Sequence, residues 1–204
     1  KKGGFGCTYE ACHILSNRKV AIKEFFISDF CNRDKKSSNI MVAAQSKKEL
    51  VDRLKNKFIR EARSIWSLNH RGIVRVSDVF EENNTAYYVM DYIEGKALDD
   101  IILEKGRLSE SDMLRYIRQV ADTLRYVHSK NILHLDIKPS NIMIDAEGNA
   151  ILIDFGASKQ YDKAGGADTS TLTCRTLGYA PLEQIYNRVG VFYPATDIYA
   201  LGAT

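Results

Sequence analysis

The alternation of apolar and polar residues predicts short strands in the first ninety residues of the chain. Residues 20–26, with the sequence VAIKEFF, are rich in apolar and aromatic side chains and predict one strand. Residues 73–80 and 85–90 are two further apolar-rich runs, and the polar residues 81–84 separate them. A polar turn between two such runs is typical of an antiparallel hairpin.

A helix is expected between the first strand and this hairpin. Four apolar residues there recur at spacings of three and four, which places them on one helical face: Phe58, Ala62, Ile65 and Trp66. Arg60 and Glu61 then lie on other faces. Residues 29–48 are polar and basic, and we expect an exposed insertion without regular structure. This insertion is interpreted as a solvated loop, with contact to a partner as the alternative.

The second half of the chain favours helices and one further hairpin. Ser109, followed by Asp112 three residues later, resembles a helix-capping box. The helix that begins there is expected to bury a stripe made of Leu114, Ile117, Ala121 and Leu124. Residues 142–144 and 151–154 predict a small hairpin with a turn at residues 145–149. We find no internal repeat, so the pattern predicts an α+β chain, with strands first and helices later.

Composition narrows the class of protein. The chain has 204 residues, of which 45% are hydrophobic and 27% charged, as is ordinary for a soluble globular protein. Its net charge of +3 is small and both signs are interspersed, which argues against nucleic acid or a membrane surface as the default partner. No apolar run approaches the roughly 18 residues of a membrane span. A cytoplasmic location is expected, although the sequence leaves open a membrane anchor beyond these residues.

The cysteines agree with that expectation. Cys7, Cys12, Cys31 and Cys174 form no C-x-x-C pair and have no histidine at a spacing typical of zinc sites. A metal site or a secreted disulfide framework is therefore not expected, and reduced thiols fit best.

Candidate chemistry gathers in residues 134–141, with the sequence HLDIKPSN. Asp136 and Asn141 bracket a loop before one strand of the predicted hairpin, and Asp154 follows its second strand, so three oxygen-bearing side chains are expected at one end. Such hard oxygen ligands suit Mg²⁺. Lys138 adds a cation beside the same place. A proton acceptor, a metal and a lysine together favour phosphoryl transfer, although each residue taken singly is also compatible with a capped turn or a surface charge.

Four motifs in order now point to a family. HLDIKPSN followed by DFG at residues 154–156, and preceded by GGFG and VAIK, resembles the catalytic core of a eukaryotic-like (Hanks-type) serine/threonine protein kinase. The loops DFGASK and GYAPLEQ are most similar to bacterial members. This resemblance implies a protein-kinase-like two-lobed α+β fold, with a mainly β lobe over residues 1–90 and part of a mainly α lobe over residues 91–204. It also implies ATP, Mg²⁺ and a protein substrate with a serine or threonine acceptor.

The resemblance assigns roles within the catalytic loop. It makes Asp136 the base that accepts the proton of the substrate hydroxyl, and it makes Asn141 and Asp154 the residues that hold Mg²⁺. Lys138 matches the pattern of serine/threonine kinases, and similar loops in small-molecule kinases tend to lack it. Thr176 matches the threonine that packs on the catalytic aspartate.

A second set of roles falls in the first lobe. The resemblance implies that Lys23 contacts the α- and β-phosphates and pairs with a glutamate on the following helix. Glu61 is the best match for that glutamate, and Glu49, which is closer to the polar insertion, is the alternative.

The nucleotide-binding residues are also implied by the resemblance. The phosphate-covering loop would contain Gly3, Gly4, Gly6 and Thr8. Here Lys1 stands where the first glycine is expected and Thr8 where a valine is expected, and a glycine cluster alone would be read as a hairpin turn. The residues matching the adenine pocket and hinge are Ala21, Met90, Asp91, Ile93 and Met143. Most of these are apolar residues that also fit an ordinary core.

Leu135 departs from the family pattern, because most members have arginine before the catalytic aspartate. That arginine is a buried cation which a phosphorylated residue of the activation segment neutralises. Leucine cannot do this, so activity is expected to depend little on phosphorylation of the candidate positions Thr169, Ser170, Thr171 and Thr173. The alternative is that another basic residue, such as Arg175, takes that role.

The end of the activation segment carries a second departure. Aligned through Glu183, Leu182 stands where proline is expected, and Asp197 matches the residue that braces the catalytic loop. The resemblance covers the small lobe nearly whole and the large lobe in part. Two other functions remain open: a pseudokinase or nucleotide-binding scaffold without turnover, and, less favoured, a small-molecule kinase.

Overall fold

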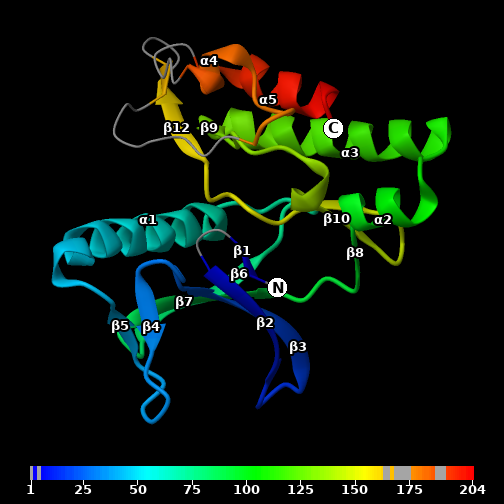
Figure 1. Ribbon diagram of the computed structural model, residues 1–204. Coiled ribbons are helices and arrows are strands. Elements are labelled where there is room, and N and C mark those ends of the chain that lie inside the picture. The colour runs from blue at the N-terminus through cyan, green and yellow to red at the C-terminus, as the bar shows by residue number, and fades with distance from the viewer. Residues whose placement is uncertain (1, 4–5, 163–165, 168–175, 187–191) are drawn as a thin grey trace. The chain divides into compact units, whose positions relative to one another are not determined.

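The computed structural model describes residues 2–3, 6–162, 166–167, 176–186 and 192–204 (Figure 1). The chain forms two compact units. Unit 1 contains Lys1–Leu68 and Arg75–Tyr92, and unit 2 contains Asn69–Val74 and Ile93–Thr204. The predicted division after residue 90 therefore differs from this partition mainly in the short segment 69–74, which packs within unit 2.

Unit 1 is built on a five-stranded antiparallel sheet with the order β1-β2-β3-β7-β6. Its strands are β1 (Lys2–Gly3), β2 (Gly6–His13), β3 (Arg18–Phe25), β6 (Val76–Glu82) and β7 (Thr85–Asp91). The predicted first strand and the predicted hairpin are confirmed. The hairpin turn uses Asn83 and Asn84 at φ values of 51° and 58°, a left-handed conformation that asparagine tolerates better than most residues.

The predicted helix is α1 (Lys48–Trp66), which lies along the sheet of unit 1 (Figure 1). The ring of Phe58 lies 5.7 Å from that of Phe25 and 5.0 Å from that of Tyr88, measured between centroids. Ala62 and Ile65 are also buried, as expected. Trp66 was wrongly placed in this core: it is 52% exposed, because it ends the helix at the edge of the apolar stripe.

The expectation of an unstructured insertion is wrong. The segment contains a hairpin of β4 (Cys31–Arg33) and β5 (Ile40–Val42), followed by the 3-10 turn η1 (Gln45–Lys47). Cys31 and Ile40 are buried although most of their neighbours are exposed. Two apolar side chains in a polar segment give no periodic signal, so the pattern missed this hairpin.

Unit 2 combines helices with two small sheets. One sheet has the order β11-β10-β8 and the other β13-β12-β9. Its helices are α2 (Leu98–Lys105), α3 (Glu110–Ser129), η2 (Pro139–Asn141), α4 (Leu182–Ile185) and α5 (Pro194–Gly202). Its strands are β8 (Gly95–Ala97), β9 (Ile132–Leu133), β10 (Ile142–Asp145), β11 (Ala150–Leu152), β12 (Lys159–Asp162) and β13 (Gly166–Ala167). The predicted hairpin is β10–β11, and α3 and α5 lie side by side (Figure 1). None of the helices in the described part of the chain has the length and apolar character that crossing a bilayer requires.

Helix α3 begins as predicted but buries a different stripe. The Ser109 hydroxyl accepts a hydrogen bond from Asp112 N at 3.1 Å, which confirms the cap. The buried residues are Tyr116, Val120, Thr123, Leu124 and Val127. Of the predicted stripe only Leu124 is fully buried, and Leu114 is exposed. Both stripes have helical spacing, so the period could not decide which one packs.

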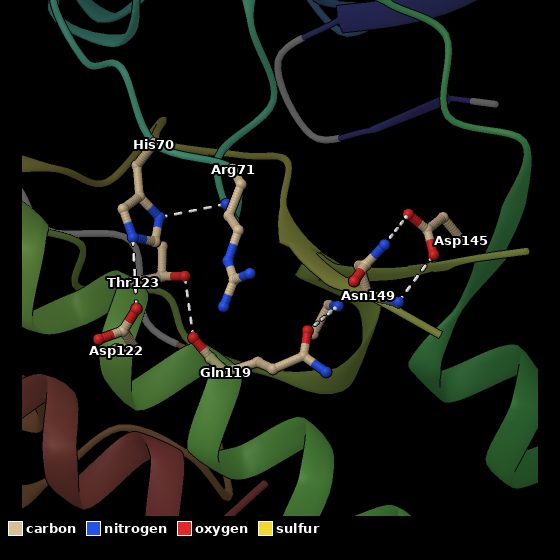
Figure 2. Close-up of a pocket in the computed structure, with 9 residues that line it drawn as sticks. His70, Arg71, Gln119, Asp122, Thr123, Asp145 and Asn149 are labelled. Carbon is tan, nitrogen blue, oxygen red and sulfur yellow. Dashed lines mark hydrogen bonds and ion pairs between the residues drawn. The ribbon is translucent and has the colours of Figure 1, made fainter. Parts of the chain in front are cut away.

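Within unit 2, segment 69–74 lines a polar cavity of about 250 Å³ together with α3 and the β10–β11 hairpin (Figure 2). Its lining residues are His70, Arg71, Gly72, Gln119, Asp122, Thr123, Asp145, Asn149 and Ala150. Many of their polar groups bond to one another. His70 Nδ1 accepts from Gly72 N at 3.1 Å, and Gln119 Oε1 accepts from Ala150 N at 2.8 Å. This cavity contains none of the predicted catalytic residues, and its bonding is that of a structural joint.

Gly72 permits the close approach in this joint. A Cβ atom at residue 72 would lie 2.0 Å from Thr123 Oγ1 on α3. We expect Gly72→Ala to lower the free energy of unfolding by about 1–3 kcal/mol, the usual cost of overpacking a core. Gly202→Ala is the matched control, because nothing lies within 4 Å of its Cβ position. Urea denaturation checks both, and equal stability of the two variants would contradict the account.

Candidate active site

Lys23 and Glu61 form an ion pair within unit 1. Lys23 Nζ lies 3.4 Å from Glu61 Oε1, and the two side chains are only 15% and 8% exposed. Tyr88 OH donates to the same carboxylate oxygen at 3.4 Å. Strand β3 supplies the lysine, helix α1 the glutamate and strand β7 the tyrosine. Glu61 is therefore the partner of Lys23 in the structure, and the alternative partner Glu49 is not.

The expected phosphate-covering residues lie in β1 and β2. Gly3 is paired with Gly6, and Thr8 is paired with Lys23 on the neighbouring strand. Gly4 lies outside the described residues. A Cβ atom at Gly6 would come within 2.3 Å of the Glu24 carbonyl oxygen, so this glycine is required by the packing of β2 on β3 as well.

The expected adenine residues divide between the two units. Ala21 and Met90 are directly opposite each other on β3 and β7, and both are buried. Asp91, at the end of β7, accepts a hydrogen bond from Arg18 Nη2 at 3.2 Å. Ile93 and Met143 belong to unit 2, where Met143 lies on β10.

Asp136 is the centre of a compact cluster in unit 2. Thr176 Oγ1 donates to Asp136 Oδ1 at 2.7 Å, and Asn141 Nδ2 donates to Asp136 Oδ2 at 2.8 Å. Lys138 Nζ lies 2.8 Å from Asp136 Oδ2 and donates to Thr176 Oγ1 at 2.9 Å. The structure thus brings three of the predicted catalytic residues, Lys138, Asn141 and Thr176, around the carboxylate of a fourth, Asp136.

Asn141 and Asp154 supply oxygen atoms next to this cluster in sequence. The Asn141 amide nitrogen is directed to Asp136, donating to its backbone carbonyl as well as to its carboxylate. The amide oxygen of Asn141 is then the atom of this side chain that is able to coordinate a metal. Asp154 follows β11, and its Oδ1 accepts from Gly156 N at 3.0 Å. The donor set is one carboxylate and one amide oxygen, which fits Mg²⁺ bound together with phosphates and water.

No ready-made cage exists in the described part of the chain. It contains no group of three or more histidine, cysteine, aspartate or glutamate side chains that could hold a metal ion. Mg²⁺ rarely uses such cages, since it prefers a few carboxylates together with substrate phosphates. The residues present therefore fit a metal that arrives with a nucleotide.

Asp197 on α5 fixes the backbone of the catalytic loop. Its Oδ2 accepts from His134 N at 2.9 Å and its Oδ1 from Leu135 N at 2.7 Å. His128 Nε2 lies 2.7 Å from the same carboxylate. Gln184 Nε2 donates to the Leu135 carbonyl oxygen, also at a buried position. The roles of His128 and Gln184 were missed from the sequence, because neither residue lies within the motif they support.

Leu135 is buried and has an unusual backbone conformation. Its φ is 63°, in the left-handed region that branched and bulky residues seldom occupy. Its side chain is 2% exposed and belongs to an apolar cluster made of Leu133, Leu135, Ala157, Tyr161 and Phe192. The position at which the family resemblance predicts arginine is therefore filled by apolar packing in this chain. The candidate phosphorylation sites Thr169, Ser170, Thr171 and Thr173, and the alternative cation Arg175, lie outside the described residues.

Glu183 also has a partner in unit 2. Thr196 Oγ1 donates to Glu183 Oε1 at 3.0 Å, which joins α4 to the start of α5. Leu182, the departure from the expected proline, is the first residue of α4 and is exposed.

Comparison with known proteins identifies the class. The protein kinase domain family matches residues 2–204, and the chain belongs to this family. The Hanks-type resemblance and the two-lobed α+β fold class are thus confirmed. The solved apo form of PpkA-294 matches with a TM-score of 0.84 and 29% identity, over 99% of this chain and 70% of that chain.

Two protein kinases are related to the chain in sequence, at 36% and 30% identity. The serine/threonine-protein kinase PrkC of Bacillus subtilis is 36% identical over 203 residues, which cover 98% of this chain and 28% of PrkC. The human hormonally up-regulated neu tumor-associated kinase is 30% identical over 201 residues, covering 98% of this chain and 25% of that protein. The chain therefore spans about a quarter of the length of these relatives.

His134 gives a testable dependence of stability on pH. Full burial lowers the pKa of this imidazole, although the Asp197 charge opposes the shift. Its Nδ1 accepts from Asp136 N at 3.3 Å, and its Nε2 has no hydrogen-bond partner among the described residues. The unfolded chain takes up a proton near pH 6.5 while the folded chain resists it, so stability is lost as the pH falls below that value.

We expect the free energy of unfolding to fall by at most about 1.4 kcal/mol per pH unit from this residue below pH 6.5. His134→Asn keeps an acceptor near the Asp136 amide but cannot be protonated, so its stability should fall less steeply with acid. Denaturant titrations between neutral and mildly acidic pH measure the difference between the two slopes. Identical slopes would show that His134 does not resist protonation.

Proposed function

We propose that this chain is the catalytic core of a protein serine/threonine kinase that transfers the γ-phosphoryl group of ATP to serine or threonine hydroxyls with Mg²⁺. The observation that carries the proposal is the cluster around Asp136. A carboxylate held by a threonine hydroxyl, an amide and an ammonium group is fixed in position and has an oxygen with which to accept a proton. Phosphoryl transfer depends mainly on such positioning and on charge neutralisation.

Asp136 acts as the general base in this proposal. It orients the substrate hydroxyl and takes its proton as the oxygen attacks the γ-phosphorus, while the bond from that phosphorus to the β,γ-bridging oxygen breaks and ADP leaves. Lys138 places its ammonium group next to the carboxylate and is suited to stabilise negative charge on the transferred group. Thr176 holds both side chains, so it is a positioning residue of the same cluster.

The remaining residues bind the nucleotide and the metal. When Mg²⁺ is bound, it supplies positive charge to the phosphate oxygens. Asn141 and Asp154 would hold it through their oxygen atoms. Lys23 would bind the α- and β-phosphates, and Glu61 keeps the lysine side chain directed by their ion pair. Ala21, Met90 and Met143 would contact the adenine, and the backbone of residues 91–93 would bind its edge.

The substrate class is supported by Lys138. The hydrogen bond from Lys138 to Thr176 ties the lysine to the activation segment, beside the acceptor of the proton. The lysine is the residue that the resemblance associates with serine and threonine acceptors, and the name of the relative PrkC also describes a serine/threonine kinase.

Transfer of labelled γ-phosphate from Mg-ATP to a generic protein substrate, and to the protein itself, tests the function. Asp136→Asn should reduce transfer to serine and threonine by about 10²- to 10⁴-fold, as expected for the loss of a general base. Asp145→Asn is the control, since Asp145 caps the β10–β11 turn by accepting from Glu147 N and Asn149 N. If the wild-type protein binds nucleotide but neither it nor Asp136→Asn transfers phosphate, the chain is a pseudokinase. Transfer to a metabolite with none to protein would indicate a small-molecule kinase.

We further propose that phosphorylation of the activation segment matters little for activity, because the apolar cluster around Leu135 leaves no buried cation at this position. Treatment with a phosphatase should leave the rate of phosphoryl transfer nearly unchanged. A large, reproducible loss of activity that rephosphorylation in this segment restores would overturn the proposal.

The substitution Leu135→Arg should destabilise the fold by on the order of 3 kcal/mol, since it buries an unpaired charge.

A further inference from the structure

The residue next to Lys23 carries a buried carboxylate that the proposed chemistry does not use. Side chains alternate between the two faces of a strand, so Glu24 points away from the face that Lys23 occupies. Its side chain is only 2% exposed. A carboxylate buried to this degree is costly unless donors and a cation compensate it.

Three donors satisfy this carboxylate. Tyr87 OH donates to Glu24 Oε1 at 2.8 Å, and Tyr9 OH donates to Glu24 Oε2 at 2.9 Å. Burial and the bond to Glu24 raise the pKa of Tyr9 to about 12, so its hydroxyl keeps its proton. The cation is Arg33, whose Nη2 also bonds to Oε2. Glu24 thereby ties β2, β3 and β7 to the β4–β5 hairpin.

The hairpin is fixed to unit 1 by further contacts. Arg33 Nη1 donates to the Ser38 carbonyl oxygen at 3.3 Å, which holds the guanidinium within the hairpin turn. Its guanidinium also lies 5.6 Å from the centroid of the Phe26 ring. Ile40 N donates to the Asn83 carbonyl oxygen at 2.8 Å, at the turn between β6 and β7. Arg33 therefore links the turn of the hairpin to the buried carboxylate of the sheet.

The hairpin connects the two elements that carry the Lys23–Glu61 pair. It follows β3 directly, and only residues 43–47 lie between its second strand and α1. In the first ten residues of α1 only Val51 is buried, whereas the later part packs with Phe58, Ile59, Ala62 and Ile65. Apolar packing thus holds the later part of the helix. Its beginning is joined to the hairpin through residues 43–47 (Figure 1), and Lys55 on this part also pairs with Glu81 on β6 at 2.8 Å.

We propose that the β4–β5 hairpin is a positioning element for nucleotide binding, in which the Arg33–Glu24 ion pair fixes β3 and the start of α1 so that Lys23 and Glu61 meet. Arg33 is a positioning residue, because it acts through Glu24 and the hairpin and not on the nucleotide. This inference rests on the proposed function of Lys23 in binding ATP phosphates.

The test compares the dissociation constant for Mg-ATP, measured by calorimetry well below the melting temperature, in Arg33→Met, Arg33→Lys and wild type. Arg33→Met should weaken binding on the order of tenfold, a typical size for coupling between sites. Arg33→Lys should restore part of the affinity, because it returns the charge without the planar guanidinium. Arg53→Met is the matched control, since Arg53 is an exposed arginine on α1.

A double-mutant cycle separates positioning from general stability. If Arg33 acts through the Lys23–Glu61 pair, its substitution should weaken binding much less once Glu61→Gln has already broken that pair. Additive effects, or an Arg33→Met affinity equal to that of Arg53→Met, would overturn the proposal. If Arg33→Met does not fold, Glu24→Gln replaces it. Its amide oxygen can still accept from Tyr87 OH, its amide nitrogen can donate to Tyr9 OH, and the ion pair with Arg33 is lost. Unchanged affinity in Glu24→Gln would then overturn the proposal.

A second readout keeps this inference distinct from the proposed function. Hydrogen exchange of the amides in residues 48–57 reports the attachment of α1 without any nucleotide, and Arg33→Met should accelerate it relative to Arg53→Met. Wild-type protein that binds no Mg-ATP would overturn the proposed function. Suppose instead that wild-type protein binds Mg-ATP and that Lys23→Met abolishes this binding. Unchanged affinity and unchanged hydrogen exchange in Arg33→Met would then overturn the role of the hairpin and leave the proposed function intact.

Discussion

The arrangement of the catalytic loop depends on one buried carboxylate, that of Asp197. It is fully buried, and it accepts hydrogen bonds from the backbone amides of His134 and Leu135 and lies beside the imidazole of His128. Two consecutive amides can point at one carboxylate only if the chain turns sharply, and the positive φ of Leu135 provides that turn. This change of chain direction places Asp136 within hydrogen-bond distance of Thr176 and Asn141. A helix residue distant in sequence thus determines where the proposed base lies.

In unit 1 a functional side chain, that of Lys23, is positioned by a strand of the sheet. Neighbouring residues of β3 are used for opposite purposes, since Lys23 pairs with Glu61 on one face and Glu24 binds tyrosines and an arginine on the other. Both carboxylates are nearly buried, and each has a cation within ion-pair distance. The strand between them is held from both faces, which fixes its register and therefore the position of the lysine.

The sequence was most informative where chemistry is local. The loop around Asp136 and the hairpin that leads to Asp154 could be predicted because the motifs are short and their turns are specified by nearby residues. The cap of α3 at Ser109 followed from the same kind of local bond. Glu61 was identified only through the family resemblance, since its position on the helix face indicated no partner.

The failures concern packing between segments far apart in the sequence. Helix α3 has two apolar stripes, and the one containing Tyr116 and Val120 packs while Leu114 stays exposed, a choice made by neighbouring elements. The β4–β5 hairpin was missed because only Cys31 and Ile40 are buried in an otherwise polar segment, and the partner of Arg33 lies on another strand. The supporting roles of His128 and Gln184 were missed for the same reason, since their partners lie 69 and 49 residues away.

The apolar environment of Leu135 also has a consequence for the sensitivity of the fold to salt. Interactions between charges weaken as ions screen them, whereas contacts among apolar side chains do not, and strongly hydrated salts even strengthen them. Leu135 packs with Tyr161 and Phe192, so the link between the catalytic loop, β12 and the segment before α5 is of the second kind. This apolar link is therefore expected to be less sensitive to ionic strength than the exposed ion pairs of the chain.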